Sequence, residues 1–166
     1  MKTHTLAIIP AALLALGAHA ATPTIEPLGM SSYKLDWDGA ADQAYFIQWS
    51  LDLGSWQYFP VIDQGVEHDE FNFSSSTRKF FVRVASWPYS GSDPHGADFD
   101  GDGLSNIFEL MFGLDPLDKD TDGDGILDGE EELDEDGALN TSEYLAGSNP
   151  KVKDHPDVKL SVTVGN

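Results

Sequence analysis

Residues 120–131 read Asp-Thr-Asp-Gly-Asp-Gly-Ile-Leu-Asp-Gly-Glu-Glu, and this stretch decides how the second half of the chain folds. Acids stand at positions 1, 3, 5, 9 and 12, glycine stands at position 6, and position 7 offers a backbone carbonyl. Calcium takes about six to eight oxygen ligands, and a loop with oxygens at these positions can wrap one ion. The predicted ligands are Asp120, Asp122, Asp124, Ile126, Asp128 and Glu131.

The same register occurs twice more, once before and once after this stretch. In residues 98–109 every position fits, and the predicted ligands are Asp98, Asp100, Asp102, Leu104, Asn106 and Glu109. The third register follows the second without a spacer, and its predicted ligands are Glu132, Asp134, Asp136, Ala138, Asn140 and Glu143. Glutamate at its position 1 shifts the first oxygen outward, so we expect a weaker or differently arranged site.

Electrostatics favours a cation in these loops over the alternative of a solvated acidic linker. Two carboxylates about 5 Å apart repel by roughly 3 kcal/mol at an effective dielectric near 20. A loop that gathers four or five of them closes only around a cation, so metal binding and folding are expected to be one event. Magnesium prefers a small octahedral shell, and zinc prefers cysteine and clustered histidine. We therefore expect two or three Ca²⁺ ions.

Charge and aromatic residues divide the chain into two halves. The formal net charge is -20, and residues 93–157 hold 20 acids against three lysines. All four tryptophans precede this acidic region. Such a chain repels nucleic acid and anionic membrane surfaces, so neither is an expected partner. We predict a β module over residues 21–90, acidic calcium-binding repeats over 93–157, and a C-terminal strand or tail over 158–166.

The N-terminus has the pattern of a secretory signal. Lys2 and His4 precede an apolar run over residues 6–18, and Ala18-His19-Ala20 has small residues where a signal peptidase cleaves. The alternative is a buried helix. We predict a signal peptide over residues 1–20, no membrane insertion after its cleavage, and an extracellular or periplasmic location. Because the chain has no cysteine, metal ions are the expected substitute for disulfides.

The residue pattern in the first half of the chain predicts short β-strands. Residues 33–37, 44–50, 56–62 and 79–85 are rich in aromatic and branched side chains, and Phe71 and Phe73 alternate with polar neighbours. We therefore expect a mostly β protein, with a small antiparallel sandwich followed by an irregular calcium-stapled region with short helical turns. The order of these segments resembles a short fibronectin type III module, which implies the same sandwich.

Two segments after the loops also repeat. Residues 109–116 and 143–150 each predict one helical turn, a glycine C-cap and a proline stop. We expect Leu110, Met111, Phe112, Tyr144 and Leu145 to form a small core beside the ions.

The loops and their Gly-Leu-Asp-Pro and Gly-Ser-Asn-Pro connections resemble the thrombospondin type 3 repeats of bacterial secreted proteins, over about residues 97–150. The resemblance implies an extracellular spacer or adhesive region that folds on calcium binding. The second and third loops depart from the family because they abut without the usual spacer. Dockerins, which pair EF-hand-like calcium loops with short helices, are a competing resemblance.

The expected function is structural or adhesive, and we expect no enzyme activity. His68, His95 and His155 are scattered, and no serine lies in a nucleophile elbow. A cell-surface protein or a glycan is the expected partner. The alternative is a calcium-stabilised carbohydrate-binding or dockerin-like docking module. In the carbohydrate-binding case, the side chains that form an aromatic platform instead of filling the core are Trp37, Trp49, Trp56 and Trp87. Residues 158–164 alternate as a strand, which pairs with the N-terminal sheet or with a partner.

Overall fold

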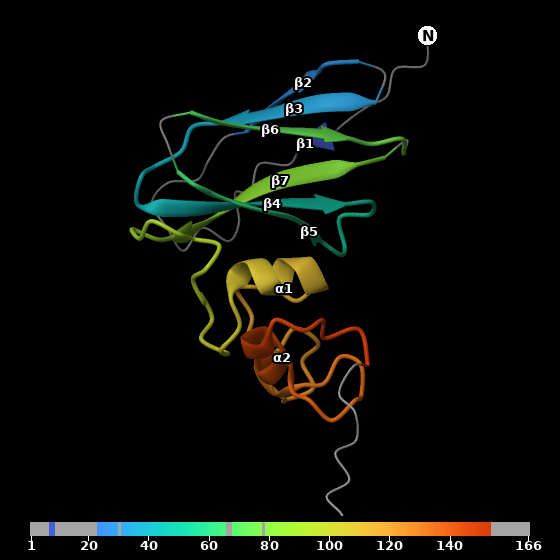
Figure 1. The fold of residues 1–166 in the computed structure, drawn as a ribbon. Coiled ribbons are helices and arrows are strands. Elements are labelled where there is room, and N and C mark those ends of the chain that lie inside the picture. The colour runs from blue at the N-terminus through green and yellow to red at the C-terminus, as the bar shows by residue number, and fades with distance from the viewer. Residues whose placement is uncertain (1–6, 9–22, 30, 66–67, 78, 154–166) are drawn as a thin grey trace, which may run out of the picture. The chain divides into compact units, whose positions relative to one another are not determined.

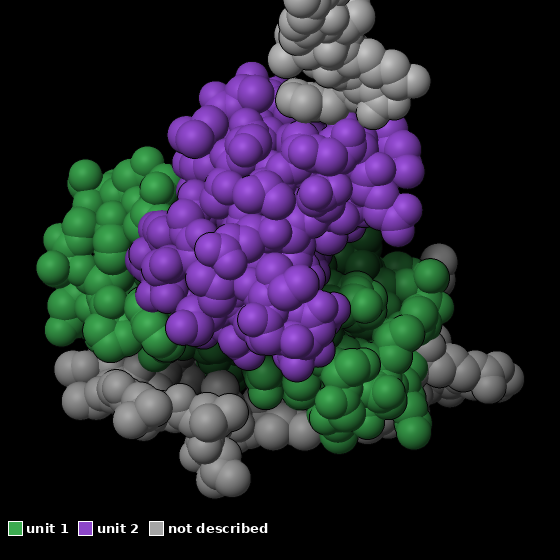
Figure 2. Space-filling model, turned by 90° about the horizontal axis from the view of Figure 1, so that it is seen from below, with its two compact units in different colours: residues 1–97 green, residues 98–166 purple. Residues whose placement is uncertain are grey.

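A computed structural model describes residues 7–8, 23–29, 31–65, 68–77 and 79–153 of the chain (Figure 1). The chain divides into two compact units, residues 1–97 and residues 98–166, which Figure 2 colours separately. The division falls at the first residue of the first predicted calcium loop. Within the described residues, no helix has the length and apolar character that a membrane crossing requires.

Unit 1 is an antiparallel β-sandwich, as the sequence predicts. One sheet has the strand order β1-β7-β4-β5 and the other has the order β2-β3-β6. Among the described strands, all pairs are antiparallel except β1 with β7, which is parallel. The strands are β1 (Ala7–Ile8), β2 (Thr24–Pro27), β3 (Ser32–Trp37), β4 (Gln43–Ser50), β5 (Gln57–Gln64), β6 (Asp69–Ser74) and β7 (Phe81–Pro88).

The two sheets share one core because alternate residues of their strands point inward. Its buried residues come from both sheets and include Leu35, Trp37, Tyr45, Ile47, Phe73, Phe80, Val82 and Val84. Pro60, which lacks an N–H, lies in the edge strand β5, between the Tyr58–Gln48 and Ile62–Phe46 pairs where the register with β4 shifts. The fold therefore rests on the period-two pattern of the sequence.

Two of the sequence predictions concern the chain termini. β1 lies within the predicted signal peptide, and the rest of residues 1–20 falls outside the described residues. The predicted C-terminal strand over residues 158–164 also falls outside them. Both remain predictions.

In its described residues, 98–153, unit 2 consists mainly of loops with two short helices and one 3₁₀ turn. They are α1 (Asn106–Phe112), η1 (Asp128–Glu130) and α2 (Asn140–Ala146). Both helices end at a left-handed glycine, Gly113 and Gly147, whose N–H groups bond the carbonyls of Glu109 and Glu143. The glycine caps agree with the sequence, and the helices are longer than the single turn expected.

The core of unit 2 differs from the prediction at two positions. Leu104, Phe108 and Leu114 form its buried cluster, with Phe112 and Tyr144 packed against it. Met111 and Leu145 are 65% and 84% exposed, so placing them in the core was wrong. The reason is helical period: Met111 and Leu145 each follow a buried glutamate, Glu109 or Glu143, by two residues. At about 100° per residue they lie on the opposite face of their helix.

Candidate metal centre

The three predicted loops have the same internal hydrogen bonds. In each loop the carboxylate at position 1 accepts a hydrogen bond from the backbone N–H of position 6. The carboxylate at position 3 accepts from the N–H of position 5, and the carboxylate at position 5 accepts from the N–H of position 7. The side chain at position 9 accepts from the N–H of position 2. These twelve contacts measure 2.8–3.3 Å. Each backbone therefore curls around its own acids, as the spacing predicts.

Two residues per loop have left-handed backbone angles. At position 6 they are Gly103, Gly125 and Gly137, with φ of 98°, 96° and 94°. At position 4 the first two loops have Gly101 and Gly123, but the third has Glu135 with φ of 60°. A side chain in this region strains the backbone, so the third loop closes at a cost that the other two avoid.

The first loop brings its carboxylates into two groups that share Asp102. One oxygen each from Asp98, Asp100 and Asp102 lies within 4.8 Å of the others, and so does one each from Asp102, Glu109 and Asp128. All three acids of the second group are buried. Two ionised carboxylates at this separation repel by about 3.5 kcal/mol at an effective dielectric near 20. The arrangement suits a divalent cation.

Glu109 is the most confined of these acids. Its side chain is 0% exposed, and neither carboxylate oxygen has a hydrogen-bond partner among the described residues. Burial, followed by the charges of Asp100 and Asp102, raises the pKa of Glu109 to about 9. Burial and the charge of Asp102 raise the pKa of Asp100 to about 6. A buried acid without a partner fits the bidentate position 12 ligand of a calcium loop.

The second loop gathers fewer of its predicted ligands. Asp120, Asp122 and Asp124 form a group within 4.8 Å and lie near the surface. Glu131 is not in that group, although burial and the charge of Asp122 raise its pKa. Asp128 is buried and accepts bonds from the N–H and the hydroxyl of Thr121, at 2.9 and 2.6 Å. Its carboxylate joins the first loop's acids instead.

The third loop has the frame without the cluster. Glu132 accepts from the Gly137 N–H at 3.1 Å, as aspartate does at position 1 of the other loops. Among the described residues, however, its acids form no group of three within 4.8 Å. Asp134 is buried and its Oδ2 has no hydrogen-bond partner within the described part. Glu143 is also buried, and its Oε1 accepts from the Ser148 hydroxyl at 3.3 Å.

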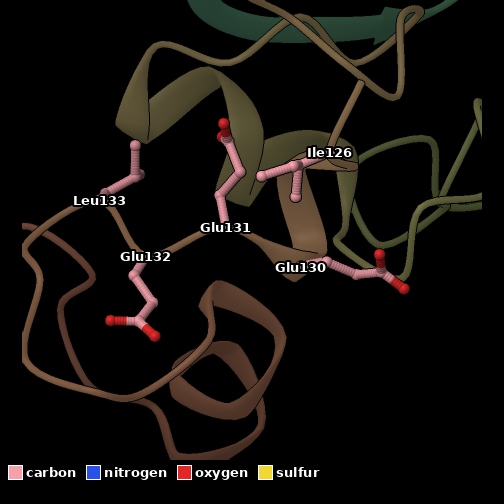
Figure 3. Close-up of a pocket in the computed structure, with 5 residues that line it drawn as sticks. All are labelled: Ile126, Glu130, Glu131, Glu132 and Leu133. Carbon is pink, nitrogen blue, oxygen red and sulfur yellow. The ribbon is translucent and has the colours of Figure 1, made fainter. Parts of the chain in front are cut away.

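The junction of the second and third loops explains how they abut. Ile126, Glu130, Glu131, Glu132 and Leu133 line a surface hollow there (Figure 3). The backbone at Glu131 is extended, so neighbouring side chains point to opposite sides. Figure 3 shows the carboxylates of Glu131 and Glu132 pointing in opposite directions. The last ligand of one loop and the first of the next therefore do not compete for one ion.

Bonds between loops join the three frames into one unit. The Gly129 N–H donates to Asp102 Oδ2 at 2.9 Å, and the Thr141 hydroxyl donates to the Gly129 carbonyl at 2.9 Å. The Asn140 amide donates to the Asp128 carbonyl at 2.7 Å. Sequence spacing does not reveal these contacts, because they depend on how the loops pack.

The backbone carbonyls predicted as ligands belong to residues of differing burial. Leu104 and Ala138 are buried, whereas the side chain of Ile126 is exposed.

Of the tryptophans, Trp37 is buried in the core of unit 1, and the ring of Trp49 stacks on that of Phe80 with 5.7 Å between the centroids. Trp56 has the Arg83 guanidinium over its ring, 4.1 Å from the centroid. One face of the Trp56 ring, one of the four in the alternative glycan platform, is therefore covered by Arg83.

Comparisons of this chain with models of protein families, with curated proteins and with solved structures give no match. The loops themselves therefore carry the functional argument.

Proposed function

We propose that the protein is a secreted calcium-binding structural or adhesive protein, in which Ca²⁺ folds and stabilises unit 2. The observation that carries this proposal is Glu109. A fully buried acid whose two oxygens have no hydrogen-bond partner in the described part of the chain, beside two further buried carboxylates, needs a cation to be stable in its ionised form.

The chemistry of the donors favours calcium. The loops offer carboxylate and carbonyl oxygens, which are the ligands of hard cations, and they repeat one frame of hydrogen bonds. Two of the loops also bring together the three carboxylates at their positions 1, 3 and 5. The likeness to thrombospondin type 3 repeats, and secretion after cleavage near residue 20, belong to the same proposal.

Thermal unfolding in chelator, calcium and magnesium tests the proposal. Calcium at about 10 mM, which is roughly 10–100 times a Kd of about 10⁻³–10⁻⁴ M, is expected to raise the melting temperature of unit 2, since each ion then adds about 1.4–2.7 kcal/mol. Magnesium is expected to do far less. Asp122→Asn should reduce the calcium-dependent rise, whereas the matched variant Asp118→Asn, outside the clusters, should retain it. Equal melting temperatures in chelator and calcium would exclude this function.

A further inference from the structure

We infer that Asp102, Glu109 and Asp128 form one buried calcium site between the first and second loops, so that Asp128 serves the first loop's ion. This inference rests on the proposed function. It changes the assignment of Asp128, which the register alone gives to the second loop.

The first observation is the position of Asp128. Its carboxylate lies within 4.8 Å of those of Asp102 and Glu109, and all three residues are buried. The surface group of the second loop contains Asp120, Asp122 and Asp124 without Asp128. Asp128 is therefore grouped with ligands of another loop and not with those of its own.

The second observation is Glu109, whose buried oxygens have no hydrogen-bond partner among the described residues. An ion held by Glu109 and Asp102 alone would lack ligands, because calcium takes about six to eight oxygens. Asp128 supplies one more. Two of the roughly four lone pairs of its carboxylate accept bonds from Thr121, which leaves others for a cation.

The third observation comes from comparing position 9 in the three loops. Asn106 and Asn140 occupy it in the first and third loops and accept the N–H of position 2 through an amide oxygen. That bond needs no charge. The negative charge of Asp128 therefore serves something other than its own loop's frame, and the acids that it meets are Asp102 and Glu109.

Backbone atoms of the second loop fix its contact with the first loop. The Gly129 N–H donates to Asp102 Oδ2, and a Cβ on Gly129 would lie 2.4 Å from the Asp102 carbonyl oxygen. This close approach holds Asp128 beside Asp102. The first ion consequently links two loops, and folding of the second loop completes the site of the first.

Calcium titration calorimetry of the full chain tests this site. The background variant Asp120→Asn/Asp122→Asn removes two charges of the second loop's surface group, while the asparagine oxygens can still accept the backbone bonds of that loop's frame. The cross-loop site is therefore expected to remain intact. In this background, Asp128→Asn should raise the calcium Kd of the remaining tight site by at least about tenfold. Asparagine retains the oxygen that accepts the Thr121 N–H. Adding Asp118→Asn instead removes the same charge and should change the affinity less than about threefold.

Equal affinities for the Asp128→Asn and Asp118→Asn variants would overturn the cross-loop site while leaving calcium binding in place. Absence of saturable binding in the unsubstituted protein would instead overturn the proposed function. If Asp128→Asn impairs folding, a double-mutant cycle with Glu109→Gln in calcium decides the question. The cycle compares free energies of unfolding in calcium. If both residues bind one ion, the second substitution should lower this free energy little beyond the first, whereas separate sites should give additive losses.

Discussion

Replacing Glu109 with glutamine should move the stability of unit 2 in opposite directions with and without calcium. Without calcium, the carboxyl with a pKa of about 9 is protonated at pH 7 in the folded protein. In the unfolded chain, with a pKa near 4.5, it is ionised. Taking up that proton costs about 1.4 kcal/mol per pH unit between 4.5 and 7, or about 3 kcal/mol. Glutamine is neutral in both the folded and the unfolded protein, so its burial does not require uptake of a proton.

We therefore expect Glu109→Gln to raise the melting temperature in chelator by roughly 12–24 °C, since each of the about 3 kcal/mol shifts a domain of this size by roughly 4–8 °C. In saturating calcium the variant should melt below the unsubstituted protein, because the ion loses a bidentate ligand. Differential scanning calorimetry measures both. Glu135→Gln is the control, since that side chain is 88% exposed and should change either value by less than about 0.5 kcal/mol. A variant that melts lower in chelator and binds calcium unchanged would refute this reasoning.

Three further predictions follow from the loops. Glu135→Gly should stabilise unit 2 in calcium by about 1 kcal/mol, because it relieves a positive φ, and Glu135→Ala should not. Gly129→Ala should destabilise it by about 2 kcal/mol, because the new Cβ would lie 2.4 Å from the Asp102 carbonyl oxygen and 2.7 Å from Thr141 Cγ2. In chelator, stability should fall as the pH rises from about 4.5 to about 9, because the folded state raises the pKa of Glu109 and binds the extra proton.

Thermal melts check all three. Equal melting temperatures for the glycine and alanine variants at position 135 would argue against backbone strain. A Gly129→Ala protein as stable as the unsubstituted one would show that the loops do not meet closely there. Stability in chelator that rises with pH over this range would mean that Glu109 is not buried beside other acids.

Much of the fold could be predicted from the sequence because local rules govern it. The period-two pattern of residues 33–37 and 79–85 gave strands close to β3 and β7, and both helix ends lie at the predicted glycines. The pattern failed for β2, because Thr24–Pro27 is short, contains proline and has no alternation of apolar side chains.

The candidate site shows the same division between local and tertiary causes. The spacing within each loop predicts its internal hydrogen bonds, since these depend on a few neighbouring residues. It does not predict that Asp128 lies beside Asp102, 26 residues earlier in the numbering, because that contact depends on packing of the loops. The exposure of Met111 and Leu145 was missed because three consecutive apolar residues give no helical face.

Calcium binding by unit 2 is the property on which the proposed function depends most directly. Titrating calcium into the chelator-treated full chain by isothermal calorimetry, with magnesium as the reference ion, measures this. We predict saturable binding of two or three Ca²⁺ ions, with Kd values of about 10⁻⁴–10⁻³ M, as in extracellular modules. No saturable binding at millimolar calcium would contradict the account, and the acidic loops would then have another role.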